Sequence, residues 1–337
     1  MTTLLAGDIG GTKTRLGVFG LDGNGLRAIS EERYASREYS SFYDLVKRYI
    51  GQQRVKPDFA CFGVAGPVQG NAVQTTNLPW HIEADKLAAE LSLQAVWLIN
   101  DLEANAWGIN ALEEEDLFVL NSGEIDPGGN ASIISAGTGL GEAGLYNLDG
   151  KLHPFASEGG HCDFSPRTEK EISLLRYLQG KYLHVSWERI LSGEGLSDIY
   201  DFLTEYHSEQ TPLWLETKMR ESDKAAVISW AAAKDRSSLC FEAIDMFLSL
   251  YGVEAGNHAL KLMSTSGVYI GGGIAAKNRH FFSAENFLHH FFEKGRLKPL
   301  MQKMPVKIIL NEHTALYGSA LYAAYRAGEG EITAFRL

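Results

Sequence analysis

The chain has 337 residues, of which 45% are hydrophobic and 22% charged, a composition typical of soluble globular proteins that excludes disordered and fibrous classes. This length exceeds what one ordinary hydrophobic core needs, so we expect two domains. The formal net charge of −11 disfavours binding to nucleic acid or to an anionic membrane, because the field of the protein would repel both.

Export and membrane insertion are also disfavoured. The N-terminal residues lack the basic start and long apolar stretch of a secretion signal. No apolar run approaches the ~20 residues that span a bilayer. Cys61, Cys162 and Cys240 stand far apart without a Cys-x-x-Cys pair, which disfavours disulfides and a cysteine-rich zinc site. We therefore expect a cytoplasmic protein.

The first third of the chain predicts strands, turns and short helices. Residues 4–8 are apolar up to an acidic end, residues 9–13 turn the chain, and residues 14–19 alternate, which together predict a β-hairpin. A turn at residues 21–25 then precedes a strand from residue 26 toward residue 33. The next predicted elements are an amphipathic helix near residues 42–50 with Ser41 as its N-cap, a buried strand at 59–64, a helix at 82–91 and a short strand at 96–99.

A similar pattern restarts further along. Residues 133–136 lead into a glycine turn at 137–141, followed by a strand at 144–148 and a turn at 149–150. This second hairpin predicts two domains of related design. The remaining predictions are a mostly helical stretch at 169–256, a strand at 268–270 that leads into a glycine turn and a helix, a strand at 306–310 and a last helix at 313–326. Four aromatic side chains in the helical stretch are expected in the core: Tyr177, Tyr182, Trp230 and Phe247.

Three glycine-rich turns follow predicted buried strands. Glycine lets backbone N–H groups approach phosphate oxygens closely, so such turns are typical of phosphate sites. The residues concerned are Gly7, Asp8, Ile9, Gly10, Gly11 and Thr12 in the first turn, Gly137, Thr138 and Gly139 in the second, and Gly272 in the third. One such turn alone is more often a plain hairpin turn. Three together favour a protein that holds nucleotide phosphates, and phosphoryl transfer is the leading reaction class.

Two better-known phosphate motifs are disfavoured. The first turn resembles a Walker loop, and residues 139–144 match a dinucleotide fingerprint. Both motifs require a helix after the glycines, whereas here an alternating strand follows each time. We therefore predict neither a P-loop nor a Rossmann site.

Two acidic side chains end or follow buried strands. Asp8 is placed to hold Mg²⁺ through water, since Mg²⁺ favours few protein oxygens plus phosphates; the alternative is a turn cap. Asp101 follows Asn100 at the edge where open α/β sheets place ligands, and there a carboxylate can accept a hydroxyl proton. The alternative for Asp101 is the N-cap of a helix that starts at Leu102.

Residues 157–163 carry many hydrogen-bonding groups around a Gly-Gly turn. Glu158 and His161 suit sugar hydroxyls, which need both donors and acceptors. A metal site is the alternative, but a single His, Cys and Asp so closely spaced make a poor tetrahedral zinc site. Glu188, by its local sequence, is typical of an exposed helix charge.

Taken together, these motifs resemble the bacterial glucokinase family, within the superfamily of hexokinase, actin and heat-shock chaperones. The resemblance covers nearly the whole chain. Its markers are residues 7–12, 99–101, 136–141, 158–161, 188–193 and 270–274. It implies an α/β, two-domain actin-like ATPase (ribonuclease H-like) fold with an interdomain cleft. The implied small α/β domain is residues 1–110 plus 314–337, the large α/β domain is residues 111–313, and a homodimer is implied as well.

The resemblance further implies an enzyme that uses ATP and Mg²⁺ to phosphorylate the 6-hydroxyl of D-glucose, giving glucose 6-phosphate for glycolysis. The implied glucose-binding residues are Asn100, Asp101, Glu158, His161 and Glu188, with Asp101 as catalytic base. The glycine turns named above are implied to bind ATP.

The chain departs from the family pattern at Lys13 and Thr14. These residues look more like a related family of repressors and sugar kinases, in which a cysteine cluster after a Glu-Gly-His segment holds zinc. That cluster is missing here, so no structural metal is predicted. Three alternatives stay open: a kinase for mannose, fructose or an N-acetylated hexosamine, a non-catalytic sugar-sensing protein, and a structural ATPase related to actin. The sensor should carry a basic DNA-reading domain, which this acidic chain does not show.

Overall fold

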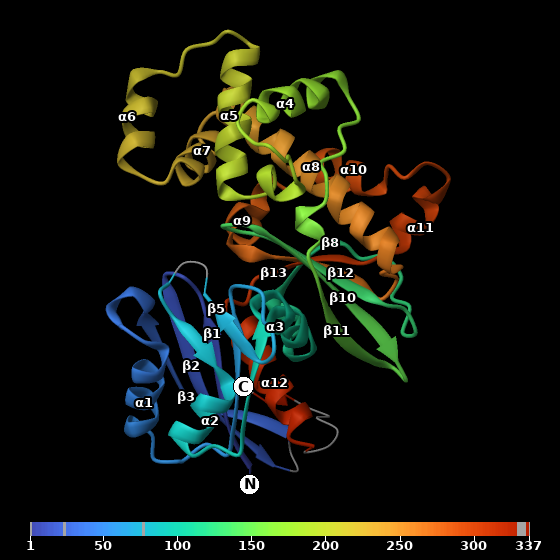
Figure 1. Ribbon diagram of the computed structural model, residues 1–337. Helices are drawn as coiled ribbons and strands as arrows, with labels where there is room; N and C mark the ends of the chain where they lie inside the picture. Colours follow the sequence, from blue (N-terminus) through green and yellow to red (C-terminus); the bar gives the residue numbers. More distant parts are fainter. Residues whose placement is uncertain (1, 23–24, 76–77, 329–334, 337) are drawn as a thin grey trace. The chain divides into compact units, whose positions relative to one another are not determined.

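The computed structural model describes residues 2–22, 25–75, 78–328 and 335–336, and the chain folds into two compact units (Figure 1). The first unit comprises Met1–Asp116, His153–Ala156 and Asn311–Leu337, and the second comprises Leu117–Leu152 and Ser157–Leu310. The predicted turn at residues 21–25 includes Gly23 and Asn24, which lie outside the described residues, as do residues 329–334.

A six-stranded sheet forms the centre of the first unit, in the order β14-β3-β2-β1-β4-β7. Its strands are β1 (Thr2–Ile9), β2 (Lys13–Asp22), β3 (Gly25–Ala35), β4 (Phe59–Val64), β7 (Ala95–Asn100) and β14 (Phe335–Arg336). β1 and β2 are antiparallel, which confirms the first predicted hairpin, whereas β1, β4 and β7 are mutually parallel. The carboxyl ends of these three strands therefore meet at one edge of the sheet.

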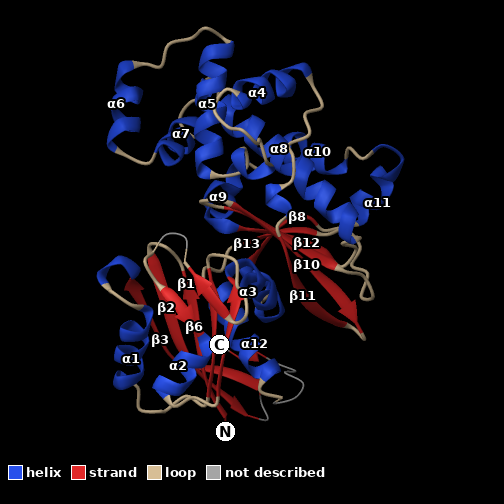
Figure 2. Ribbon diagram, in the orientation of Figure 1, coloured by secondary structure: helices blue, strands red, loops and turns tan. Residues whose placement is uncertain are grey.

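Helices cover both faces of this sheet (Figure 2). They are α1 (Phe42–Gln52), α2 (Ala84–Leu91), α3 (Asp101–Gly108) and α12 (Thr314–Arg326). Alternate residues of β1 point to opposite faces, so Leu5 packs in a core with α1 and α2, while Leu4 packs in a core with α3 and α12. Ser41 caps α1 by accepting the Asp44 N–H, as predicted.

The predicted helix at residues 82–91 is wrong at its start. His81–Glu83 form a strand, β6, which pairs with β5 (Ala72–Gln74), and the helix α2 begins only at Ala84. Ile82 is buried while His81 and Glu83 are exposed, which is the period-two pattern of a strand. Pairing with β5, which precedes these three residues in the chain, decides their conformation.

The second unit is built around another six-stranded sheet, in the order β11-β10-β9-β12-β13-β8. Its strands are β8 (Leu117–Asn121), β9 (Ala131–Ala136), β10 (Leu140–Leu148), β11 (Lys151–Ser157), β12 (Gly267–Gly271) and β13 (Val306–Ile309). The antiparallel pair β9 and β10 confirms the second predicted hairpin, and β9, β12 and β13 are parallel. Both sheets thus combine a hairpin with two further parallel strands. The edge strands β8 and β11 were not predicted, because neither shows a regular buried and exposed alternation.

The long helix α8 organises the core of the second unit. The helices of this unit are α4 (Glu169–Gln179), α5 (Gly193–Tyr206), α6 (Leu213–Glu221), α7 (Lys224–Ala232), α8 (Leu239–Leu262), α9 (Gly272–Asn278), α10 (His289–Phe292) and α11 (Lys298–Lys303). Phe247 of α8 is buried, as predicted, and Tyr177 and Tyr182 pack against the same core. The prediction for Trp230 is wrong, since its side chain is 41% exposed. None of the helices in the described residues combines the length and apolarity needed to cross a membrane.

Candidate active site

Three parallel strands bring predicted site residues to one edge of the sheet in the first unit. In the register, Asp8 of β1 lies beside Gly63 of β4, and Val64 of β4 lies beside Asn100 of β7. Asp8 and Asn100 are therefore two strand spacings apart at the same carboxyl edge, about 10 Å along the hydrogen-bonding direction. The glycine turn after Asp8 is closed by the Gly10 N–H, which donates to Lys13 O at 3.0 Å.

Asn100 and Asp101 mark the passage from β7 into α3. Asn100 is the N-cap: its Oδ1 accepts the Leu102 N–H at 2.9 Å, and its Nδ2 donates to Gly66 O at 3.4 Å. Asp101 is the first helical residue, and its Oδ1 accepts the same Leu102 N–H at 2.9 Å. The N-cap of this helix, which was the alternative role for Asp101, is therefore Asn100. The Asp101 carboxylate lies at the start of a helix, whose positive dipole end stabilises negative charge.

The carboxylate of Asp8 lies in a field that favours a bound cation. Burial and the neighbouring Asp101 carboxylate raise the pKa of Asp8 to about 6, although Arg15 opposes the shift. A cation beside two such carboxylates would relieve both effects, because it interacts favourably with the ionised forms. Oxygen donors of this kind are the ligands that Mg²⁺ prefers, so the residues present fit the predicted magnesium site.

A buried hydroxyl on α12 ties the strands of this edge together. Ser319 is fully buried, and its Oγ donates to Gly7 O at 2.9 Å and accepts the Gly63 N–H at 3.2 Å. The C-terminal helix therefore fixes the ends of β1 and β4 immediately before Asp8. Because a buried backbone group without a partner is costly, this hydroxyl contributes to the position of the first glycine turn.

The second unit brings together three of the predicted sugar-binding residues. His161 lies at the end of a 3₁₀ turn (Gly159–His161), with its Nε2 atom 3.8 Å from Glu158 Oε2 and its Nδ1 atom 4.0 Å from Glu188 Oε1. Glu188 is the most buried of the three side chains, and its Oε2 accepts the Leu140 N–H at 3.0 Å. Acceptors and a donor facing one another in this way suit the hydroxyl groups of a sugar.

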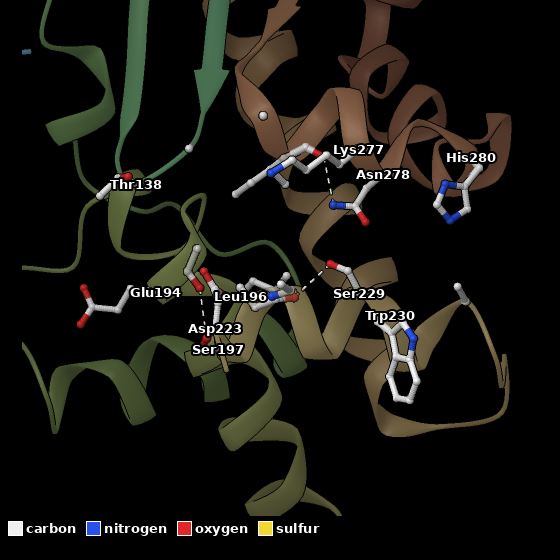
Figure 3. A pocket seen from close by; sticks show the side chains of 17 residues that line it. Thr138, Glu194, Leu196, Ser197, Asp223, Ser229, Trp230, Lys277, Asn278 and His280 are labelled. Carbon is white, nitrogen blue, oxygen red and sulfur yellow. Dashed lines mark hydrogen bonds between the residues drawn. The ribbon is translucent and has the colours of Figure 1, made fainter. Parts of the chain in front are cut away.

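Two glycine turns of the second unit meet at a cavity of about 790 Å³ (Figure 3). In the sheet, Gly271 of β12 lies beside Ser135 of β9, so the turns that follow these parallel strands are neighbours. Gly137 and Thr138 of one turn and Gly273 of the other line the cavity. Gly272 has a φ of +84°, and a Cβ atom there would lie 2.3 Å from Ala136 O, so the chain can make this close passage only with glycine.

The rest of the cavity wall comes mainly from helices α5, α7 and α9, of which only the first residues of α5 and α9 belong to the family markers named above. Figure 3 shows Glu194 and Ser197 of α5, Trp230 of α7, and Lys277 and Asn278 of α9 around it. A volume within the usual range for small-molecule sites, together with an aromatic ring and a few polar groups, suits a ligand of nucleoside size. Only the turn residues Gly137 and Thr138 were predicted.

One group in the part of the chain that the structure describes has metal-ligand atoms close together. It consists of His289, His290 and Glu293 at α10. The guanidinium of Arg167 lies beside it, with Nη1 at 3.3 Å from His290 Nδ1 and 3.4 Å from Glu293 Oε2. Because a positive charge already contacts two of these ligands, we assign no metal to this group.

Residues 5–326 of the chain match the Glucokinase family. A glucokinase from Nostoc sp. is 41% identical over 96% of this chain and 99% of the relative, and one from Synechocystis sp. is 39% identical over 95% and 97%. The crystal structure of a glucokinase from an Antarctic psychrotroph has a TM-score of 0.85 and 27% identity, covering 96% of this chain and 99% of that one. This likeness confirms the predicted α/β, actin-like ATPase fold.

Proposed function

Because the chain belongs to the glucokinase family, we propose that it is a glucokinase, which transfers the γ-phosphoryl group of ATP to the 6-hydroxyl of D-glucose and supplies glucose 6-phosphate to glycolysis. The observation that carries this proposal is the family match over residues 5–326. Two features of the structure support it independently. In the first unit, the Asp101 carboxylate comes directly after the carboxyl end of β7. In the second unit, two glycine turns line a cavity.

The proposed glucose-binding residues are Asn100 and Asp101 of the first unit and Glu158, His161 and Glu188 of the second. The close grouping of the last three supports this assignment, since their carboxylates accept, and their imidazole can donate, the hydrogen bonds of vicinal hydroxyls. Glu188 is oriented by a backbone N–H, which reduces the side-chain entropy lost when a sugar binds.

Asp101 is the proposed catalytic base. Phosphoryl transfer asks a protein mainly to align the nucleophile and to stabilise spreading charge. A carboxylate at the start of a helix that follows the sheet edge can orient the 6-hydroxyl and accept its proton as the oxygen attacks phosphorus.

The proposed nucleotide-binding residues are those of the glycine turns: Gly7, Asp8, Ile9, Gly10, Gly11 and Thr12 of the first unit, and Gly137, Thr138, Gly139 and Gly272 of the second. The cavity beside Thr138 supports placing the adenosine in the second unit, with the Trp230 ring and the polar groups of α9 as its surroundings. Backbone N–H groups of the turns would then hold the phosphates.

Asp8 would hold Mg²⁺ through water. The raised pKa of Asp8, caused by burial and by Asp101, supports this role, because the site favours added positive charge. When bound, the ion would neutralise charge on the phosphate oxygens. The proposal also includes a homodimer and a cytoplasmic location. The homodimer rests on the family resemblance and is tested by sedimentation velocity, and the location rests on ATP as donor and is tested by cell fractionation.

The test is a coupled assay of the purified chain with glucose, mannose, fructose and N-acetylated hexosamines, each with ATP, ADP and polyphosphate. We expect ATP-dependent turnover with the highest kcat/KM for glucose. A higher kcat/KM for another hexose would replace glucose as substrate. Binding of sugar without any turnover would instead support a sensor, and the absence of sugar binding in calorimetry would support a structural ATPase.

Replacement of Asp101 tests the base. We expect Asp101→Asn to lower kcat about a hundredfold to ten-thousandfold, the usual range for a general base, while calorimetry still detects glucose binding. Asp85→Asn is the matched control, because Asp85 is an exposed aspartate in the first turn of α2 in the same unit. Near-normal turnover of Asp101→Asn would remove Asp101 from this role.

A further inference from the structure

A buried ionisable pair lies beneath the sugar-binding segment of the second unit, and the mechanism above does not use it. Glu142 of β10 and His258 of α8 are 1% and 4% exposed. His258 Nε2 lies 3.1 Å from Ala143 O, and His258 Nδ1 lies 3.2 Å from Glu142 Oε2. A carbonyl oxygen can only accept, so Nε2 carries a proton and donates it. Nδ1 faces the Glu142 carboxyl group, so this buried contact holds the carboxyl group against the imidazole.

The carboxyl group of Glu142 in turn supports the backbone between Glu158 and His161. A Cβ atom on Gly159 would lie 2.0 Å from Glu142 Oε2, and one on Gly160 would lie 2.2 Å from Leu140 O. The Gly-Gly turn therefore rests directly on β10, with no space between them. Leu140 and Glu142 are two residues apart on the strand, so their side chains point to the same face.

The same end of β10 also holds the third sugar-binding residue of this unit. The Leu140 N–H donates to Glu188 Oε2 at 3.0 Å, and a Cβ atom on Gly139 would lie 2.4 Å from that same oxygen. The short stretch from Gly139 to Glu142 thus contacts both segments that carry the proposed glucose ligands of this unit. Within this stretch, Glu142 is the residue whose position depends on a distant helix, through His258.

We propose that Glu142 and His258 are positioning residues for glucose binding, which rests on the proposed function. His258 orients the Glu142 carboxyl group, and Glu142 sets the position of the Gly159–Gly160 backbone, which carries Glu158 and His161 on either side. If the His258 contact is lost, the buried carboxyl group loses the partner that faces it and must move to find another. The Gly-Gly turn resting on it would then move too, and a misplacement of about 1 Å is enough to lower activity substantially.

Two substitutions of similar size separate this role from a general loss of stability. In His258→Asn the amide can take the place of Nδ1 and keep the contact with Glu142, whereas in His258→Gln it can take the place of Nε2 and keep only the hydrogen bond to Ala143 O. We expect KM for glucose to stay near the wild-type value in His258→Asn and to rise roughly tenfold or more in His258→Gln and Glu142→Ala. KM for ATP should change little in all three variants.

Glu171→Gln is the control, because Glu171 is a buried carboxylate on α4 of the same unit and accepts its hydrogen bond from Arg167 rather than from the pair. It should leave KM for glucose unchanged. Damage to the fold alone would lower the active fraction, and thus kcat, without raising KM for glucose selectively. Calorimetry of glucose binding without ATP provides a second readout, and the dissociation constants should follow the same order.

Two results would overturn the proposal. If His258→Gln and Glu142→Ala bind glucose as the wild type does, these residues do not position the sugar site. If His258→Asn is impaired as strongly as His258→Gln, the contact between His258 and Glu142 is not what positions the sugar site. Failure of the proposed function looks different, since the wild-type protein itself would then show neither glucose binding nor glucose-dependent consumption of ATP.

Discussion

The ionised carboxylate of Asp8 should lower the unfolding free energy of the protein at neutral pH. Its pKa in the folded protein is about 6, raised from 3.8 mainly by burial and secondly by Asp101. Folding therefore favours the protonated form. The stability that this contributes is complete below about pH 3.8, and it is lost as the pH rises through about 6. Above that pH, both the folded and the unfolded chain carry an ionised Asp8, and the folded state bears the cost.

The substitution Asp8→Asn removes this titration. A difference of about two pKa units corresponds to about 3 kcal/mol of unfolding free energy above pH 6, an upper value because the side chain keeps some exposure to solvent. The two pKa values give a gain of about 1 kcal/mol for Asp8→Asn over the wild type near pH 4.5 and about 3 kcal/mol near pH 7.5. The variant should therefore become more stable relative to the wild type, by about 2 kcal/mol, across this range.

The assay is urea unfolding of both proteins at several pH values without nucleotide or metal, with hydrogen exchange of β1 and β4 peptides to assign the change to the first unit. Using the change with pH cancels any constant effect of the amide group. Glu90→Gln, an exposed carboxylate of α2, is the control and should show no such trend. A stability difference between Asp8→Asn and wild type that is independent of pH, or that falls as pH rises, would refute the reasoning. The variant should also lose most kinase activity, which separates stability from function.

Three further predictions concern the structural supports of the site. Gly272→Ala should lower the unfolding free energy by about 1–3 kcal/mol and raise KM for ATP, because φ is +84° there and Ala136 O leaves no room for a Cβ atom. The control Gly273→Ala should not destabilise the fold, since the space around its Cβ position is open, and equal denaturation midpoints for the two variants would contradict the prediction. Ser319→Ala should cost about 1–3 kcal/mol in urea unfolding, since Gly7 O and the Gly63 N–H lose a buried partner, and a change within experimental error would show that other groups satisfy them. Trp230→Leu should raise KM for ATP on the order of tenfold with little change in KM for glucose, because the indole ring on the cavity wall would stack on the adenine. Steady-state kinetics with each substrate varied in turn measure this, and an unchanged KM for ATP would remove the ring from the nucleotide site.

Much of the architecture could be predicted because it depends on patterns within a few residues. The two hairpins follow from alternation on both sides of a glycine turn, and the structure has them at β1 to β2 and at β9 to β10. Asp8 and Asn100 were expected at strand ends, since each closes a buried apolar run. The rejection of the P-loop and Rossmann motifs was also correct, because a strand rather than a helix follows each glycine turn.

Residues whose environment depends on distant partners were predicted poorly. Trp230 was expected in the core, but it lies on the cavity wall, where the ammonium groups of Lys218 and Lys234 lie 4.6 Å and 4.2 Å from its ring centre. An aromatic residue at helical spacing is more often buried, and its local sequence carries no sign of the cavity. Glu188 was unremarkable by its neighbours and gained a role only through the family resemblance. The structure then placed it against Leu140 and His161.

The amino-acid sequence by itself determined where the strands, the glycine turns and the acidic strand ends lie, because hydrophobic alternation and glycine torsions act locally. Only the tertiary structure decided which of these turns share a cavity and which carboxylates influence one another's pKa. The parallel pairing of β9 with β12 and the packing of α8 beneath β10 join segments far apart in the chain. Such pairings depend on the collective burial of apolar surface, which no short stretch of sequence encodes.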